Sequence, residues 1–123
     1  IRCYRQRFMH SSPDTMLANI DRDEEGFFLD PSDWTPELIA PLCDEAEVDA
    51  SEEVLRVVWF VREHYERNQV VPEARLVLRY LRGTLGTERA TRRYLQSLFP
   101  YGYGQQACKI AGMRKPRKLM LDV

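Results

Sequence analysis

The sequence lacks the short motifs that mark the common enzyme classes. It contains no G-x-S-x-G nucleophile turn, no glycine-rich phosphate loop and no H-E-x-x-H pair. Histidine is scarce, and His64 has no acidic residue or cysteine at metal-ligand spacing on its own helical face. These absences give no support to a hydrolase, a kinase or a metalloenzyme, and we expect neither a metal site nor a cofactor.

Cysteine is also scarce, and long apolar runs are missing. The thiols are Cys3, Cys43 and Cys108, an odd number at wide spacing without a C-x-x-C pair, which argues against a disulfide framework and against a zinc site. No apolar run approaches the ~18 residues of a membrane span. Nothing resembles the three regions of a signal peptide. The sequence therefore predicts free thiols in a cytoplasmic protein that does not enter a membrane.

What is present is the composition of one globular domain. The chain has 123 residues, of which 44% are apolar and 30% are charged, and its net charge is −1. The charge is unevenly distributed along the chain. Acidic residues gather in DRDEE and CDEAEVDASEE, whereas five Lys or Arg residues and no acid lie between Lys109 and Lys118. This asymmetry is more informative about partners than the net charge.

The N-terminal part predicts a leader followed by a small hairpin. Residues 1–16 show no clear hydrophobic period, and we expect a flexible leader or extension there. In LANIDRDEEGFFLD, short apolar ends flank a charged centre that contains Gly26, and glycine accepts the positive φ of a tight turn. The pattern predicts a β-hairpin with Leu17–Ile20 and Phe27–Leu29 as its arms.

The strongest helical signal is the segment DASEEVLRVVWFVREHYERNQ. Asp49 is the expected N-cap, and four valines at i, i+3, i+4 and i+7 form one face: Val54, Val57, Val58 and Val61. We expect this helix to be central and largely buried. A shorter helix should precede it, with Thr35 as its N-cap, Pro36 at its first position and Pro41 limiting its length.

Two further helices are expected between residues 72 and 100. The first begins at Pro72 and stops at Gly83, and the second is capped by Thr87 and ends at Pro100. A short fifth helix would carry QQACKIA. The predicted fold class is mainly α: a compact bundle of about five helices with a small N-terminal β-hairpin and a flexible C-terminal arm. The helical domain would span 17–106, and the arm, 107–123, would carry Cys108.

Cys108 is the first candidate for chemistry. A cysteine that handles sulfur must be a reachable thiolate, and adjacent cations lower the thiol pKa from about 8.5. The basic residues that follow it could do so: Lys109, Arg114, Lys115, Arg117 and Lys118. The alternative is that Cys108 is a small buried apolar side chain, because free cysteine is among the most buried residue types.

A second candidate is the pair of helices joined by GTLG, which is similar to a helix-turn-helix. The first helix carries Arg75, Arg79 and Arg82, and the second carries Arg89, Arg92 and Arg93. For nucleic acid, the candidate contacts are Arg92 and Arg93 with Arg117 and Lys118 of the arm, and such an arm adds salt-sensitive affinity for phosphates. The alternative is an ordinary solvated charged face, diluted by Glu73 and Glu88.

Several segments together carry a family resemblance. RRYLQSLFPYGYGQQACKIAGMRKP, residues 92–116, resembles the tail of the DsrC/TusE family of sulfur-relay proteins, which combines Leu-Phe-Pro, a glycine-containing stretch, Cys or Thr before Lys-Ile-Ala-Gly, and Lys-Pro. Upstream, DRDEEGFFLDPSDW is similar to the family's hairpin and following Trp, VVWFVREHY to its central helix, and VPEAR to the start of its next helix. The similarity covers residues 17–118.

The resemblance implies a sulfur carrier rather than an enzyme in its own right. Such proteins carry sulfur as a persulfide on an arm cysteine. They receive it from a sulfurtransferase complex of the DsrEFH/TusBCD type and pass it to a tRNA-thiolation enzyme or to sulfite reductase chemistry. Cys108 would be the sulfur acceptor here. The resemblance places Arg75 near the docking groove of the arm, and the substrate or partner contacts would be Arg75, Lys109, Arg114 and Lys115.

The sequence departs from the family at one position that matters for this chemistry. Leu119 stands eleven residues after Cys108, where the family's main sulfur-bearing cysteine is expected, and the ending has become MRKPRKLMLDV. Two hypotheses follow. The chain is either a sulfur-relay variant that uses Cys108 as its only arm thiol, or a non-catalytic regulatory paralogue that binds the family's partner proteins or DNA.

Overall fold

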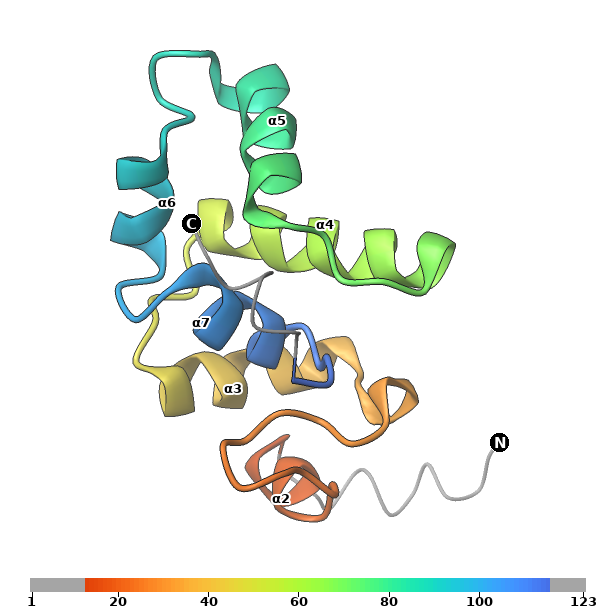
Figure 1. The fold of residues 1–123 in the computed structure, drawn as a ribbon. Coiled ribbons are helices and arrows are strands. Elements are labelled where there is room, and N and C mark those ends of the chain that lie inside the picture. Colours follow the sequence, from red (N-terminus) through yellow and green to blue (C-terminus); the bar gives the residue numbers. More distant parts are fainter. Residues whose placement is uncertain (1–12, 116–123) are drawn as a thin grey trace.

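The computed structural model describes residues 13–115 and is mainly helical, which confirms the mainly α part of the predicted fold class (Figure 1). The helical elements in chain order are α2 (Pro13–Ala18), η1 (Pro31–Asp33), η2 (Pro36–Leu38), α3 (Ile39–Ala46), α4 (Glu52–Asn68), α5 (Ala74–Leu85), α6 (Arg92–Leu98) and α7 (Tyr103–Ile110). Within 13–115 no helix is long and apolar enough to cross a bilayer.

The predicted hairpin is reduced to its turn. Gly26 has the expected positive φ of 98°, but one isolated antiparallel bridge between Arg22 and Phe28 is the only β pairing among residues 13–115. The predicted first arm is wrong, because Leu17 and Ala18 belong to α2. The Asp23 carboxylate accepts hydrogen bonds from the amides of Glu25 and Phe27, both at 2.9 Å. A side chain therefore satisfies amides that a longer ladder would have used.

Two predicted domain boundaries fall inside helices. A leader that ends at residue 16 would cut α2, and an arm that begins at residue 107 would cut α7. The helical body therefore continues at least to Met113, which is fully buried. The first part of the predicted leader, residues 1–12, lies outside the described residues.

The central helix is α4, and its valine face is buried as predicted. Its N-cap is Ser51 rather than Asp49, because the Ser51 hydroxyl accepts the Val54 amide at 3.2 Å. Thr35 and Pro36 begin the short η2 turn, as expected. Pro41 does not end the helix that follows. It lies in the first turn of α3, where the missing N–H has no intrahelical partner to lose, and α3 continues to Ala46.

The predicted turn between the third and fourth helices is mostly helical. α5 passes through Gly83 and ends at Leu85, and Gly86 adopts the positive φ of 95°. α6 begins later than predicted, capped by the hydroxyl of Thr91 rather than by Thr87. Residues 86–91 therefore connect the two helices, whereas a helix-turn-helix uses a turn of about three or four residues. This geometry does not confirm the helix-turn-helix prediction.

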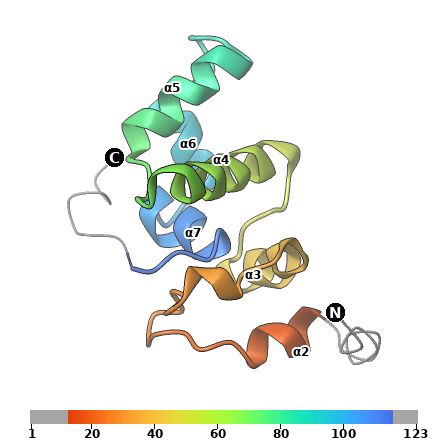
Figure 2. The same ribbon diagram turned by 90° about the vertical axis from the view of Figure 1, so that its right-hand side faces the viewer.

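The core is organised around α7. This helix packs against α4 on one side and α3 on the other, and both views show it between them (Figures 1 and 2). Its buried residues are Tyr103, Gly104, Gln106, Ala107, Cys108 and Ile110. α5 and α6 lie toward the opposite end of the molecule from α2 and α3 (Figure 1). α7, which the sequence placed partly in a flexible arm, is thus a core element.

Gly112 permits the close passage of the chain after α7. It has a φ of +74°, and a Cβ atom added to it would lie 2.5 Å from the Trp34 ring.

Gly112→Ala should therefore lower the free energy of unfolding by about 1–3 kcal/mol or more, measured by urea denaturation. Gly83→Ala is the matched control. It lies in α5, where an added Cβ atom would have no neighbour within 4 Å, and should be neutral or stabilise by up to about 1 kcal/mol. Equal effects of the two changes would contradict this packing.

Candidate functional site

Cys108 lies in the core, as the alternative of a small buried side chain predicted, and not in the reachable position that sulfur chemistry would need. Its side chain is fully buried on the inner face of α7. Burial raises the pKa of the Cys108 thiol to about 12, and a hydrogen bond with Tyr103 opposes this shift only in part. At neutral pH the group is therefore a protonated thiol, and the predicted lowering of its pKa by basic neighbours is wrong. A role for it in sulfur transfer requires the protein to open.

Tyr103 closes the site from the N-terminal end of α7. Its ring is buried, and its hydroxyl donates a hydrogen bond to the carbonyl of Pro72 at 2.6 Å. This contact joins α7 to the segment that leads into α5. Burial is the main cause that raises the pKa of the Tyr103 hydroxyl, and interaction with Cys108 adds to it. Tyr103 and Cys108 thus form a small buried polar pair, one side of which is anchored to the backbone.

The other end of α7 is closed by residues 110–115, which we call the strap. The Trp34 indole N–H donates to the carbonyl of Ile110 at 2.8 Å. The Phe28 amide donates to the carbonyl of Met113 at 3.1 Å, and the Met113 amide donates to the carbonyl of Cys108 at 3.0 Å. The strap is therefore held by backbone and side-chain hydrogen bonds to a segment far away in the sequence.

Arg62 holds the strap most extensively. Its side chain is only about 7% exposed, and its guanidinium donates to the carbonyl of Ala111 at 3.1 Å and to that of Pro31 at 2.8 Å. A third bond, of 3.0 Å, runs to the carboxylate of Glu66, and the guanidinium lies 4.7 Å from the centre of the Trp34 ring. Sequence reasoning missed this residue. The helical period could have indicated that residue 62 is buried, because it follows Val58 by four residues and so lies on the same face of the helix as the valines.

The basic residues after Cys108 bind other partners. Lys109 lies over the Phe27 ring, 5.1 Å from its centre, and Arg114 donates to the carbonyl of Leu29 at 3.0 Å. Lys115 forms an ion pair with Glu25, which raises the pKa of its ammonium group. Arg114 and Lys115 thus attach the strap to the segment around the turn. The two remaining candidates, Arg117 and Lys118, lie outside the described residues.

The other predicted contact residues lie apart from the thiol. Arg75 lies in the first turn of α5, with a side chain that is 70% exposed and ion-paired with Glu73 at 3.1 Å. Arg93 is exposed, and Arg92 lines a cavity of about 160 Å³ together with Leu95, Gln96, Gly102 and Tyr103. In the described part of the chain, no group of His, Cys, Asp or Glu side chains could hold a metal ion.

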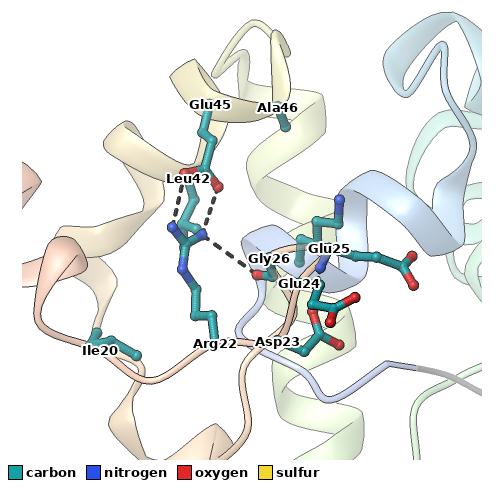
Figure 3. Close-up of a pocket in the computed structure, with 10 residues that line it drawn as sticks. Ile20, Arg22, Asp23, Glu24, Glu25, Gly26, Leu42, Glu45 and Ala46 are labelled. Atoms are coloured by element: carbon teal, nitrogen blue, oxygen red, sulfur yellow. Dashed lines mark hydrogen bonds and ion pairs between the residues drawn. The ribbon is translucent and has the colours of Figure 1, made fainter.

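A wider hollow of about 550 Å³ lies between the turn and α3 (Figure 3). Asp23, Glu24 and Glu25 line one side, and Lys109 approaches from α7. Arg22 crosses the hollow and binds both carboxylate oxygens of Glu45, at 2.6 and 2.9 Å. This ion pair raises the pKa of Arg22 and lowers that of Glu45. The hollow does not reach Cys108, and its main interaction fixes the turn to α3.

Comparison with known proteins identifies the family. The family model described as "DsrC like protein" matches residues 15–120. Sulfurtransferase TusE of Escherichia coli (strain K12) is 35% identical over 99 residues, which cover 80% of this chain and 91% of that protein. Sulfurtransferase TusE of Photorhabdus laumondii is 34% identical, covering 80% of this chain and 89% of the relative.

Solved structures agree with the sequence matches. The NMR structure of DsrC from Allochromatium vinosum matches with a TM-score of 0.69 and 36% sequence identity. The match covers 79% of this chain and 87% of the DsrC chain. The oxidized gamma-subunit of the dissimilatory sulfite reductase (DsrC) from Archaeoglobus fulgidus has a TM-score of 0.72 and 25% identity, covering 79% and 89%. The chain therefore belongs to the DsrC-like family, which includes the TusE proteins.

The two described thiols should both be protected from alkylation in the folded protein. Cys43 is 1% exposed, and its pKa is raised to about 11 by burial and by Asp44, whereas Cys108 is fully buried with a pKa of about 12. With iodoacetamide near pH 8, peptide mass spectrometry should find that Cys108 reacts no faster than Cys43, and that urea releases both. The variants Cys43→Ser and Cys108→Ser assign each adduct. Rapid native labelling of Cys108 would contradict the closed site.

Arg62→Lys should destabilise the protein although it retains the charge. A lysine ammonium cannot reproduce the planar set of donors that reaches Ala111, Pro31 and Glu66 together. Buried carbonyls would lose partners, and we expect the free energy of unfolding to fall by about 2–4 kcal/mol. Urea denaturation measures the effect. The control is Arg67→Lys at the exposed end of α4, where a change within about 0.5 kcal/mol is expected. A neutral Arg62→Lys would show that these bonds are dispensable.

Proposed function

We propose that this protein is a sulfur-relay protein of the DsrC/TusE type, in which Cys108 is the only arm thiol able to accept sulfur. The observation that carries the proposal is family membership, from a match over residues 15–120 and relatives named as sulfurtransferases. The sulfur donor would be a complex of the DsrEFH/TusBCD type. The acceptor would be a sulfite reductase or a tRNA-thiolation enzyme, in the cytoplasm. Relatives that include a gamma-subunit of dissimilatory sulfite reductase support this range of partners.

The proposed reaction is a transfer of sulfane sulfur. The Cys108 thiolate attacks the outer sulfur of a donor persulfide, a new sulfur–sulfur bond forms at Cys108, and the donor leaves as a thiolate. One such bond forms and one breaks, so no oxidant or reductant is needed. The attacking group must be a thiolate, and the closed structure keeps Cys108 protonated and out of reach. Sulfur acceptance therefore requires an open form in which the strap has separated from Trp34 and Arg62.

A second candidate function rests on two particular observations. By the family resemblance, Leu119 stands where a sulfur-bearing cysteine is expected, and the candidate acceptor Cys108 is buried in the core. A non-catalytic paralogue that binds the family's partner proteins would need neither thiol. The version of this idea that uses DNA has less support, because residues 86–91 do not form a helix-turn-helix turn.

Loading with a persulfide donor separates the two candidates. After incubation with glutathione persulfide at neutral pH, intact-mass spectrometry of a relay protein should show a gain of one sulfur atom on Cys108. Loading should be slow, and mild urea should accelerate it, because only the open form reacts. Cys108→Ser should remove the adduct, and Cys43→Ser should leave it. Absence of transferable sulfur on Cys108, in the presence of a donor complex as well, would favour the non-catalytic function.

Leu119→Cys tests the missing thiol. If its loss is what limits relay function, the variant should gain sulfur at position 119 from the same donors, at least about tenfold faster than the native chain loads Cys108. Leu119→Ser is the matched control, because it changes the side chain without supplying a nucleophile. A variant that remains inert would show that the altered ending, and not only the thiol, prevents sulfur delivery.

A further inference from the structure

Acidic and basic residues are concentrated in different segments of the chain. Acidic side chains crowd residues 21–53, where Arg22 is the one basic residue, and this segment includes α3. By contrast, the stretch 74–93 has six arginines and no acid except Glu88. Figures 1 and 2 place α5 and α6 toward the opposite end from α2 and α3, although Glu47 and Asp49 at the end of the acidic segment line a hollow together with Ser97 of α6. Part of the surface is therefore positively charged although the net charge is −1.

The arginines near α6 are available for binding. Arg92 and Arg93 are exposed and form no ion pair with residues 13–115. Arg89 lies 5.6 Å from the centre of the ring of Tyr94, which belongs to the same helix α6. On α5, in contrast, Glu73 already neutralises Arg75. We call Arg89, Arg92, Arg93 and the adjoining cavity the α6 face.

The cavity of the α6 face combines charge with apolar walls. It has a volume of about 160 Å³ and is lined by Arg92, Leu95, Gln96, Gly102 and Tyr103. This is space for an apolar side chain of ordinary size, with a guanidinium at the margin. Tyr103, which lines the cavity, also interacts with Cys108 through its hydroxyl. A molecule bound here would contact the residue that covers the thiol.

We propose that the α6 face binds a partner protein through a segment that carries acidic residues beside an apolar side chain. The acidic groups would pair with Arg92 and Arg93, because the arginine fork matches carboxylates, and the apolar side chain would enter the cavity. Nucleic acid fits the face less well. Its phosphates offer no apolar group for the cavity. Binding at this face does not depend on sulfur transfer at Cys108.

An NMR titration tests the proposal with defined probes. The probe is the peptide acetyl-Asp-Leu-Glu-Asp-amide, added at millimolar concentration to the nitrogen-15-labelled protein. We expect shifts at Arg92, Leu95, Gln96, Gly102 and Tyr103 that weaken as salt is added. Two matched peptides separate the contributions: acetyl-Asn-Leu-Gln-Asn-amide lacks the charge, and acetyl-Asp-Ala-Glu-Asp-amide lacks the apolar anchor. Both should bind more weakly than the probe.

Charge-reversal variants locate the contact. Arg92→Glu with Arg93→Glu should weaken probe binding at least about tenfold, whereas Arg67→Glu, at the end of α4 that lies away from α6, should not change it (Figure 1). If the double glutamate variant fails to fold, Arg92→Gln with Arg93→Gln replaces it. Shifts elsewhere on the protein, no shifts at all, or equal effects of all three peptides would overturn the proposal. So would duplex DNA that binds through the same arginines more tightly than the probe. Sulfur loading of Cys108 tests the relay function separately.

Discussion

The buried guanidinium of Arg62 joins three parts of the fold that are far apart in sequence. It reaches the carbonyls of Pro31 and Ala111 from α4, and its face rests on the Trp34 ring. A buried charge is costly unless its donors are satisfied, and each carbonyl would in turn cost about 1–3 kcal/mol if left without a partner. Arg62 therefore makes the positions of η1, α4 and the strap depend on one another. A displacement of any one of them would break hydrogen bonds that hold the other two.

This arrangement explains why Cys108 is in the core although its sequence setting resembles a reactive arm. The strap turns back against Trp34 immediately after α7, and Gly112 provides the positive φ and the space that this turn requires. Ile110, Ala111 and Met113 are consequently buried around the end of α7. The basic residues are drawn to Leu29 and Glu25 instead of the sulfur. The basic residues that follow Cys108 in the sequence thus interact with other groups and do not lower the pKa of its thiol.

Local patterns predicted the elements well and their tertiary surroundings poorly. The valine period identified the buried face of α4, and Gly26 identified the turn, because periodicity and positive φ are properties of a short segment. The N-cap moved from Asp49 to Ser51, and α5 continued through Gly83, since neighbouring candidates for a cap or a stop differ by little free energy. The burial of Cys108 and the role of Arg62 depend on contacts with residues 28–34, which no local pattern could supply. The resemblance identified the family, but the mobile arm that it implied from residue 107 overlaps α7, which is a core helix.

A sulfur carrier would need an accessible Cys108 and a surface that binds its partner. In this fold the contacts that concern each of them lie at opposite ends of α7. At the C-terminal end, Trp34 and Arg62 hold the strap, so the fraction of molecules with an accessible Cys108 is set by contacts in this chain. At the N-terminal end, the buried Tyr103 lines the cavity beside the exposed Arg92. A partner that binds only the closed form would not increase the reactive fraction, because a ligand shifts an equilibrium only by its differential affinity for the two states. Binding at the α6 face would therefore increase the reactive fraction only if the partner bound more tightly to the open form, in which the strap has separated from Trp34 and Arg62.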